Sequence, residues 1–83
     1  MDNFIPLVAV TGSSNIRATG YDTERQLLQI LFQNGRLYQY EAVPEEVAQD
    51  LQKAESIGKF FHKEIRPRYK AVEVPCHEGS GGL

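Results

Sequence analysis

The chain has 83 residues, which is room for one hydrophobic core and therefore for a single domain. Its one cysteine excludes an intramolecular disulfide, and its two histidines and one cysteine show no zinc-ligand spacing. A composition of 41% hydrophobic and 24% charged residues is typical of globular proteins, and a net charge of −2 argues against a general nucleic-acid binder.

The N-terminal apolar run "FIPLVAV" differs from a secretory signal, because it is short, contains Pro6 and follows the acidic Asp2. No stretch approaches the roughly 20 apolar residues that a membrane-spanning helix needs. We therefore expect a cytoplasmic protein with no membrane partner.

Three strands are predicted between residues 13 and 43. In "SSNIRATGYD" the apolar Ile16 and Ala18 alternate with polar residues, which predicts that these two side chains share one face, and Asp22 with Thr23 indicates a turn. The segments "RQLLQILF" and "RLYQY" then flank "QNG", an Asn-Gly signal that is typical of a β-hairpin.

Two registers are open for this hairpin. A two-residue Asn34–Gly35 turn would pair Phe32 with Leu37, whereas a three-residue loop ending at Gly35 would pair Phe32 with Arg36. We favour the second register, because it leaves one face of the hairpin apolar and the other more polar, as in a half-buried antiparallel sheet. The apolar face then comprises Leu28, Ile30, Phe32, Tyr38 and Tyr40.

Two helices are predicted after the strands. Pro44 suits the first turn of a helix, and Val47, Leu51 and Ala54 form one apolar stripe over about residues 44–54. Ser56 is a candidate N-cap for a second helix, which Pro67 must end at or just before Arg66. In this second helix the apolar stripe that faces the core comprises Ile57, Phe61 and Ile65.

The expected fold class is α+β, with a three-stranded antiparallel β-meander followed by two helices packed on one face. Residues 13–70 form this domain, between an N-terminal arm at 1–12 and a flexible C-terminal tail at 71–83, whose "PCHEGSGGL" is rich in Gly and Pro.

Basic residues are concentrated in the second helix and just after it. Residues 59–70 contain five Lys or Arg side chains and one acid, and four of the basic positions share one helix face at i, i+3, i+4 and i+7. We define the basic patch as Lys59, His62, Lys63, Arg66, Arg68 and Lys70. Because phosphate contacts come chiefly from Lys and Arg, the patch predicts an anion-binding surface. The alternative is a solvated helix face.

Two smaller sites are also candidates. Free amides around Ser56 and Gly58, with the Lys59 ammonium, could bind a phosphate at the start of the helix, although Gly58 serving close packing is the favoured interpretation. Tyr38 and Tyr40 could stack on nucleic-acid bases, although the favoured register makes them core residues.

Catalysis is not expected. Cys76 and His77 lie in the predicted tail, and His62 has no acidic partner evident in the sequence. We expect no metal and no cofactor.

Three motifs together resemble the KTSC domain, a small module found at the C-terminus of some lysyl-tRNA synthetases and as a stand-alone bacterial protein. They are "SSNI....GYD", "LFQNG..YQY..VP" and "A.S.GK.F...IR..Y", and they run from Ser13 to Tyr69. The resemblance implies no catalytic residues and suggests RNA binding through its synthetase context. The chain departs from the family pattern at His62, where an Asn is usual.

The leading hypothesis is a non-catalytic module that binds RNA or another nucleic acid through the basic patch. The alternative is a protein-interaction or self-association module, which would use an edge strand or the more polar sheet face with Leu27, Leu31 and Leu37.

Overall fold

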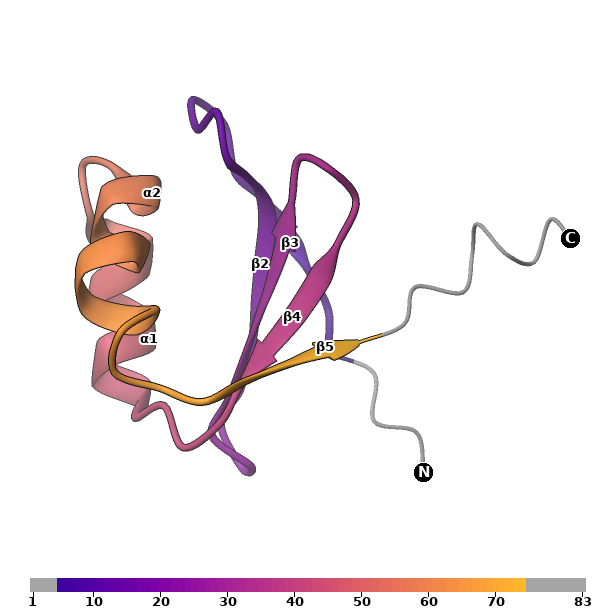
Figure 1. The fold of residues 1–83 in the computed structure, drawn as a ribbon. Helices are drawn as coiled ribbons and strands as arrows, with labels where there is room; N and C mark the ends of the chain where they lie inside the picture. Colours follow the sequence, from indigo (N-terminus) through magenta and orange to yellow (C-terminus); the bar gives the residue numbers. More distant parts are fainter. Residues whose placement is uncertain (1–4, 75–83) are drawn as a thin grey trace, which may run out of the picture.

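A single antiparallel sheet forms the centre of the computed structural model, which describes residues 5–74. The strands follow one another in chain order, and the helices lie together over one face of the sheet (Figure 1). The elements are β1 (Val8–Ala9), β2 (Ile16–Asp22), β3 (Leu27–Phe32), β4 (Leu37–Tyr40), α1 (Glu45–Lys53), α2 (Ile57–Phe60), the π-helical segment η1 (Phe61–Ile65) and β5 (Ala71–Val74). The α+β class and the helices on one face are confirmed.

The expectation of three strands is wrong, because the sheet has five. The additional strands are its two edges: β1 pairs with β2, and β5 pairs with β4. These edge strands are too short to show an alternating apolar pattern in the sequence, so they can be recognised only from their pairing with a neighbouring strand. Residues 71–74 of the expected tail form β5, whereas residues 1–4 of the arm and 75–83 of the tail lie outside the described residues.

The favoured register of the β3–β4 hairpin is confirmed. Leu31 pairs with Leu37, and the Phe32 amide donates to the Arg36 carbonyl at 2.9 Å, so the loop has three residues. Gly35 closes this loop with a φ of 91°, a left-handed conformation in which a glycine is not strained. The register therefore places Tyr38 beside Ile30 on the face that the helices cover.

The expected alternation in β2 is wrong at one point. Ile16 pairs with Phe32 but Ala18 pairs with Leu31, which leaves Arg17 as the extra residue of a bulge. The bulge separates Ile16 and Ala18 onto opposite faces. Thr19 faces the helices instead, where its hydroxyl accepts a hydrogen bond of 2.6 Å from the Gln52 amide.

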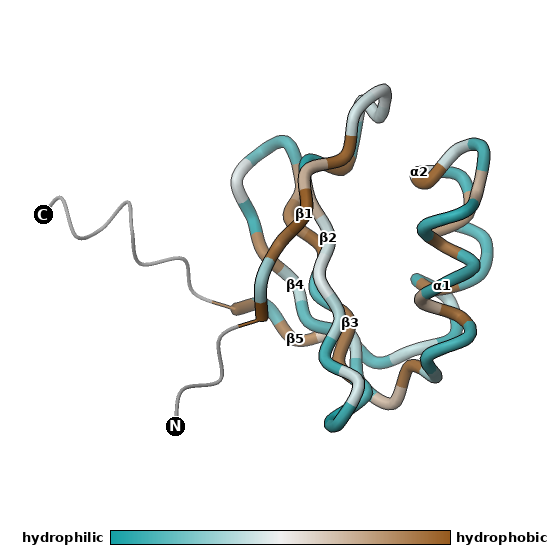
Figure 2. Tube along the Cα trace, turned by 180° about the vertical axis from the view of Figure 1, so that it is seen from behind, coloured by the Kyte–Doolittle hydropathy of each residue, from teal (hydrophilic) through white to brown (hydrophobic). Residues whose placement is uncertain are grey.

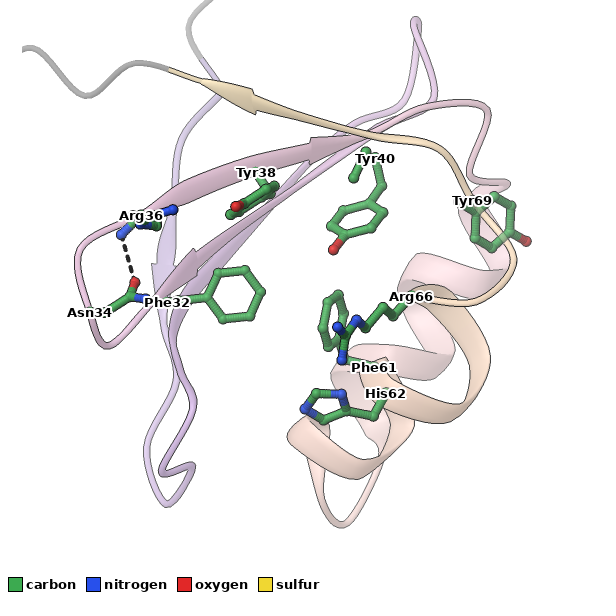
Figure 3. A pocket seen from close by; sticks show the side chains of 10 residues that line it. Phe32, Asn34, Arg36, Tyr38, Tyr40, Phe61, His62, Arg66 and Tyr69 are labelled. Carbon is green, nitrogen blue, oxygen red and sulfur yellow. Dashed lines mark hydrogen bonds between the residues drawn. The ribbon is translucent and has the colours of Figure 1, made fainter.

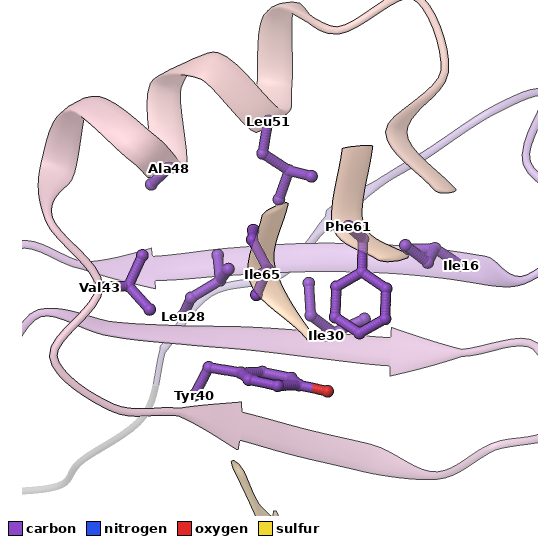
Figure 4. Packing of buried hydrophobic residues seen from close by; sticks show 9 residues of the cluster. All are labelled: Ile16, Leu28, Ile30, Tyr40, Val43, Ala48, Leu51, Phe61 and Ile65. Carbon is purple, nitrogen blue, oxygen red and sulfur yellow. The ribbon is translucent and has the colours of Figure 1, made fainter. Parts of the chain in front are cut away.

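The core lies between the helix layer and the covered face of the sheet (Figure 4). It contains Ile16, Leu28, Ile30, Tyr40, Val43, Ala48, Leu51, Phe61 and Ile65. Ser56 caps α2 as expected, and the helical region ends before Pro67. From Phe61, however, the helix widens into η1, in which the Arg66 amide donates to the Phe61 carbonyl at 2.9 Å.

On the other face of the sheet, the N-terminal segment crosses directly over Gly20. A Cβ at Gly20 would clash with the Pro6 carbonyl oxygen and lie 3.0 Å from Cγ2 of Ile5, a buried side chain. We expect Gly20→Ala to lower the free energy of unfolding by about 1–3 kcal/mol, because the segment must move to admit the methyl group.

Urea unfolding of the Gly20→Ala variant and of the unmodified protein measures this loss of unfolding free energy. The matched control is Gly58→Ala, whose Cβ would lie in ordinary contact 3.5 Å from Oγ of Ser13 and whose stability should be unchanged or higher. Equal losses for both variants would contradict the close crossing at Gly20.

Candidate functional site

A cavity of about 550 Å³ opens between the β3–β4 hairpin and η1 (Figure 3). We call it the aromatic pocket. Its lining comprises Phe32, Asn34, Arg36, Tyr38, Tyr40, Phe61, His62, Arg66, Tyr69 and Ala71. The pocket therefore combines rings and cations from segments that are distant in the sequence.

Aromatic rings in edge-to-face contact build the wall and floor of the pocket. The ring centroid of Phe32 lies 5.7 Å from that of Tyr38 and 5.5 Å from that of Phe61, and the centroids of Tyr40 and Phe61 are 5.4 Å apart. Tyr40 and Phe61 are buried, whereas Phe32, Tyr38 and Tyr69 are half-buried. The buried pair anchors the floor, and the half-buried rings offer surface to a ligand.

Three basic side chains line the pocket, and no acidic side chain is among its lining residues. Arg66 extends past Phe61 toward the cavity (Figure 3), and among residues 5–74 it forms no ion pair. Arg36 forms an exposed pair of 4.0 Å with Glu73. The His62 ring lies 5.4 Å from that of Phe61, and its Nε2 is 3.2 Å from Nδ2 of Asn15.

The structure divides the predicted basic patch. All six side chains are exposed, but only His62 and Arg66 line the pocket. Arg68 forms an ion pair of 3.4 Å with Glu64, which offsets part of its charge. Because η1 departs from the α-helical spacing, positions three or four apart no longer superpose as the sequence pattern assumes. The patch is thus His62 and Arg66 at the pocket, with its four other Lys and Arg side chains outside it.

The candidate stacking residues differ in accessibility. Tyr40 is 5% exposed and belongs to the core, and Tyr38 is half-buried at the pocket wall. Burial raises the pKa of the Tyr40 hydroxyl, and the Arg66 guanidinium partly opposes this shift. Both tyrosines therefore contribute to the site, Tyr40 as support and Tyr38 as accessible surface.

At the predicted phosphate site, Ser56 Oγ already accepts a hydrogen bond of 3.3 Å from the Lys59 amide. The cavity beside it, of about 200 Å³, also includes Glu55, whose carboxylate would repel a phosphate. Binding of phosphate by Ser56, Gly58 and Lys59 stays a prediction, and the aromatic pocket is the stronger candidate.

Sequence reasoning missed several residues of the pocket, including Phe32, Arg36, Phe61 and Tyr69. The hairpin register could have placed Phe32 and Arg36 beside Tyr38, because all three share one face. Phe61 and Tyr69 required the docking of η1 against the sheet, for which the sequence has no local signal.

Within residues 5–74, no three His, Cys, Asp or Glu side chains gather as a metal site would require, and no helix is long and apolar enough to cross a membrane. Cys76 and His77 lie outside the described residues.

The five-stranded sheet, its single helix layer and the aromatic pocket define a small α+β domain. The chain belongs to the KTSC domain family, whose model matches residues 12–69. A crystal structure of a KTSC domain protein from Yersinia pestis superposes with a TM-score of 0.80 at 33% identity, over 87% of this chain and 100% of that one.

Relatives of two kinds are found. An uncharacterized protein of Stutzerimonas stutzeri is 47% identical over 57 residues, which is 69% of this chain and 80% of that protein. A lysine–tRNA ligase of a Nostoc species is 38% identical over 69 residues, which is 83% of this chain but only 12% of the ligase. The domain thus has relatives both as a small protein and as part of a much longer one.

The raised pKa of Tyr40 makes stability sensitive to alkaline pH. An unfolded tyrosine ionises near pH 10, whereas in the folded protein the raised pKa keeps Tyr40 protonated to higher pH. The unfolded state therefore binds fewer protons above about pH 10, and the free energy of unfolding should fall as pH rises.

Tyr40→Phe should make this fall shallower, because the phenylalanine has no proton to lose. Urea unfolding at intervals from pH 8 to 11.5, with each protein compared with its own value at pH 8, measures the two slopes. Parallel curves would contradict a contribution from Tyr40.

Proposed function

We propose that this KTSC domain is a non-catalytic RNA-binding module whose contact surface is the aromatic pocket together with the basic patch. The observation that carries the proposal is the meeting of His62 and Arg66, from the basic patch, with the half-buried rings of Phe32 and Tyr38. Proteins bind single-stranded nucleic acid by this combination, in which cations contact phosphates and aromatic rings stack on bases.

Charge distribution supports local binding despite the net charge of −2. The lining of the pocket has no acid, and Lys59 and Lys63 add exposed positive charge to the helical region next to it. Phosphate groups respond to the nearby field, because charges beyond about 8 Å are screened at physiological salt. Glu73 and Glu64 are paired with Arg36 and Arg68 of the contact surface and reduce its charge there. Acidic residues beyond the screening distance weaken binding only slightly.

The synthetase relatives support RNA as the polymer. The ligases that share this domain are named as acting on tRNA, and the similar region is a small part of each. A small module with a cationic surface would add a sequence-independent contact to RNA.

A second candidate function is protein interaction or self-association through the face of the sheet that the helices leave uncovered. Leu7 and Val72 are 37% and 44% exposed. Apolar stretches of β1 and β5 lie on the side of the molecule away from the helices (Figure 2). Leu27, Leu31 and Leu37 are half-buried, and Leu31 pairs with Leu37 on this face. Contacts of this kind would be nearly insensitive to salt.

Charge reversal tests the RNA proposal. Lys63→Glu combined with Arg66→Glu should weaken binding of a single-stranded RNA octamer at least about ten-fold and reduce the slope of log K against log salt by about 0.7 per lost phosphate contact. Fluorescence anisotropy of a labelled octamer at several salt concentrations measures both quantities.

The matched control is Arg25→Glu combined with Lys53→Glu, which changes the net charge equally at two exposed positions outside the pocket. The control should bind the octamer nearly as the unmodified protein does. If both double variants weaken octamer binding equally, the effect comes from net charge alone, and the proposed contact surface is contradicted. Salt-independent dimerisation in light scattering, without octamer binding, would favour self-association.

A further inference from the structure

We propose that the aromatic pocket receives one unpaired nucleotide, with its base against Phe32 and Tyr38 and its phosphate at Arg66. This inference rests on the proposed function and specifies the ligand unit. The basic patch would then hold the flanking backbone, while the pocket selects single strands.

The size of the pocket fits one nucleotide. Its volume of about 550 Å³ lies within the roughly 300–1,000 Å³ that is usual for small-molecule sites. Its two sides come from the β3–β4 hairpin and from η1, so an occupant enters between a sheet and a helix (Figure 3). A base inside a duplex is paired and stacked on both faces, and therefore could not enter.

The rings are held in place before a ligand arrives. Phe32 makes edge contacts with Tyr38 at an interplanar angle of 79° and with Phe61 at 67°. Because Phe61 is buried in the core, Phe32 has little freedom, and a base that stacks on it would cost little side-chain entropy.

Among the basic side chains of the pocket, Arg66 is the one that we expect to contact the phosphate. This guanidinium projects toward the cavity and has no ion pair within residues 5–74, so it can contact an anion without first losing a carboxylate. Arg36, on the other side of the pocket, has part of its charge offset by Glu73. An uncharged apolar ligand would leave the Arg66 guanidinium without a counter-charge within residues 5–74.

Nucleotide fragments test the inference. Chemical shifts of the backbone amides are followed during titration with AMP, with adenosine, which lacks the phosphate, and with ribose 5-phosphate, which lacks the base. AMP should shift the amides of Phe32, Tyr38 and Arg66. Each fragment should bind about ten-fold more weakly than AMP, because it retains only the stacking or only the phosphate contact.

Three variants separate the contributions. Tyr38→Leu should weaken AMP binding about ten-fold, and Tyr38→Phe should restore it, because the ring is retained. Arg66→Gln should weaken AMP binding about ten-fold, because it removes the guanidinium that would contact the phosphate. A folded Tyr38→Leu variant that binds AMP as tightly as the unmodified protein would overturn the inference.

The octamer used above distinguishes the two proposals. If the octamer binds but AMP does not, the one-nucleotide inference is overturned and the RNA proposal stands. The same conclusion holds if the octamer binds and ribose 5-phosphate binds as tightly as AMP. If neither the octamer nor AMP binds, both are overturned. Equal affinity for the octamer and for its duplex would also overturn the inference.

Discussion

The three-residue loop of the β3–β4 hairpin is the constraint on which both the core and the pocket depend. Gly35 adopts a left-handed conformation, and Phe32 pairs with Arg36 as a result. A shift by one residue would turn Tyr38 and Tyr40 to the uncovered face of the sheet. The helices would then lose the rings on which they pack, and the pocket would lose its wall.

The π-helical segment completes the arrangement that the hairpin begins. In η1 the Phe61 and Ile65 side chains are buried, while His62 and the next residue after η1, Arg66, are exposed at the pocket. Single π-helical turns are rare in proteins, and those that occur are often found at functional sites. Here the wider turn allows η1 and the residue after it to supply the buried anchor of the ring cluster, together with the His62 ring and the Arg66 guanidinium at its rim.

The sequence predicted the fold where a local signal was strong. The Asn34–Gly35 pair indicated the hairpin, and its one-sided apolar pattern indicated the register. Ser56 and Pro67 indicated where the second helix begins and ends. Features that depend on a partner segment were missed. The edge strands and the bulge at Arg17 are defined by what pairs with them, and the pocket is defined by docking across the sheet.

The pocket and the core share residues, so binding and stability are coupled in this domain. Phe61 is buried and also lines the cavity, and the Phe32 ring contacts both Phe61 and the accessible Tyr38. A ligand that stacks on the outer rings would stabilise only the folded state, because the ring cluster does not exist in the unfolded chain. Conversely, a substitution at Phe61 changes packing and site together, whereas one at Tyr38 acts mainly on the site. Tyr38 is therefore a position at which recognition can vary with little effect on the fold.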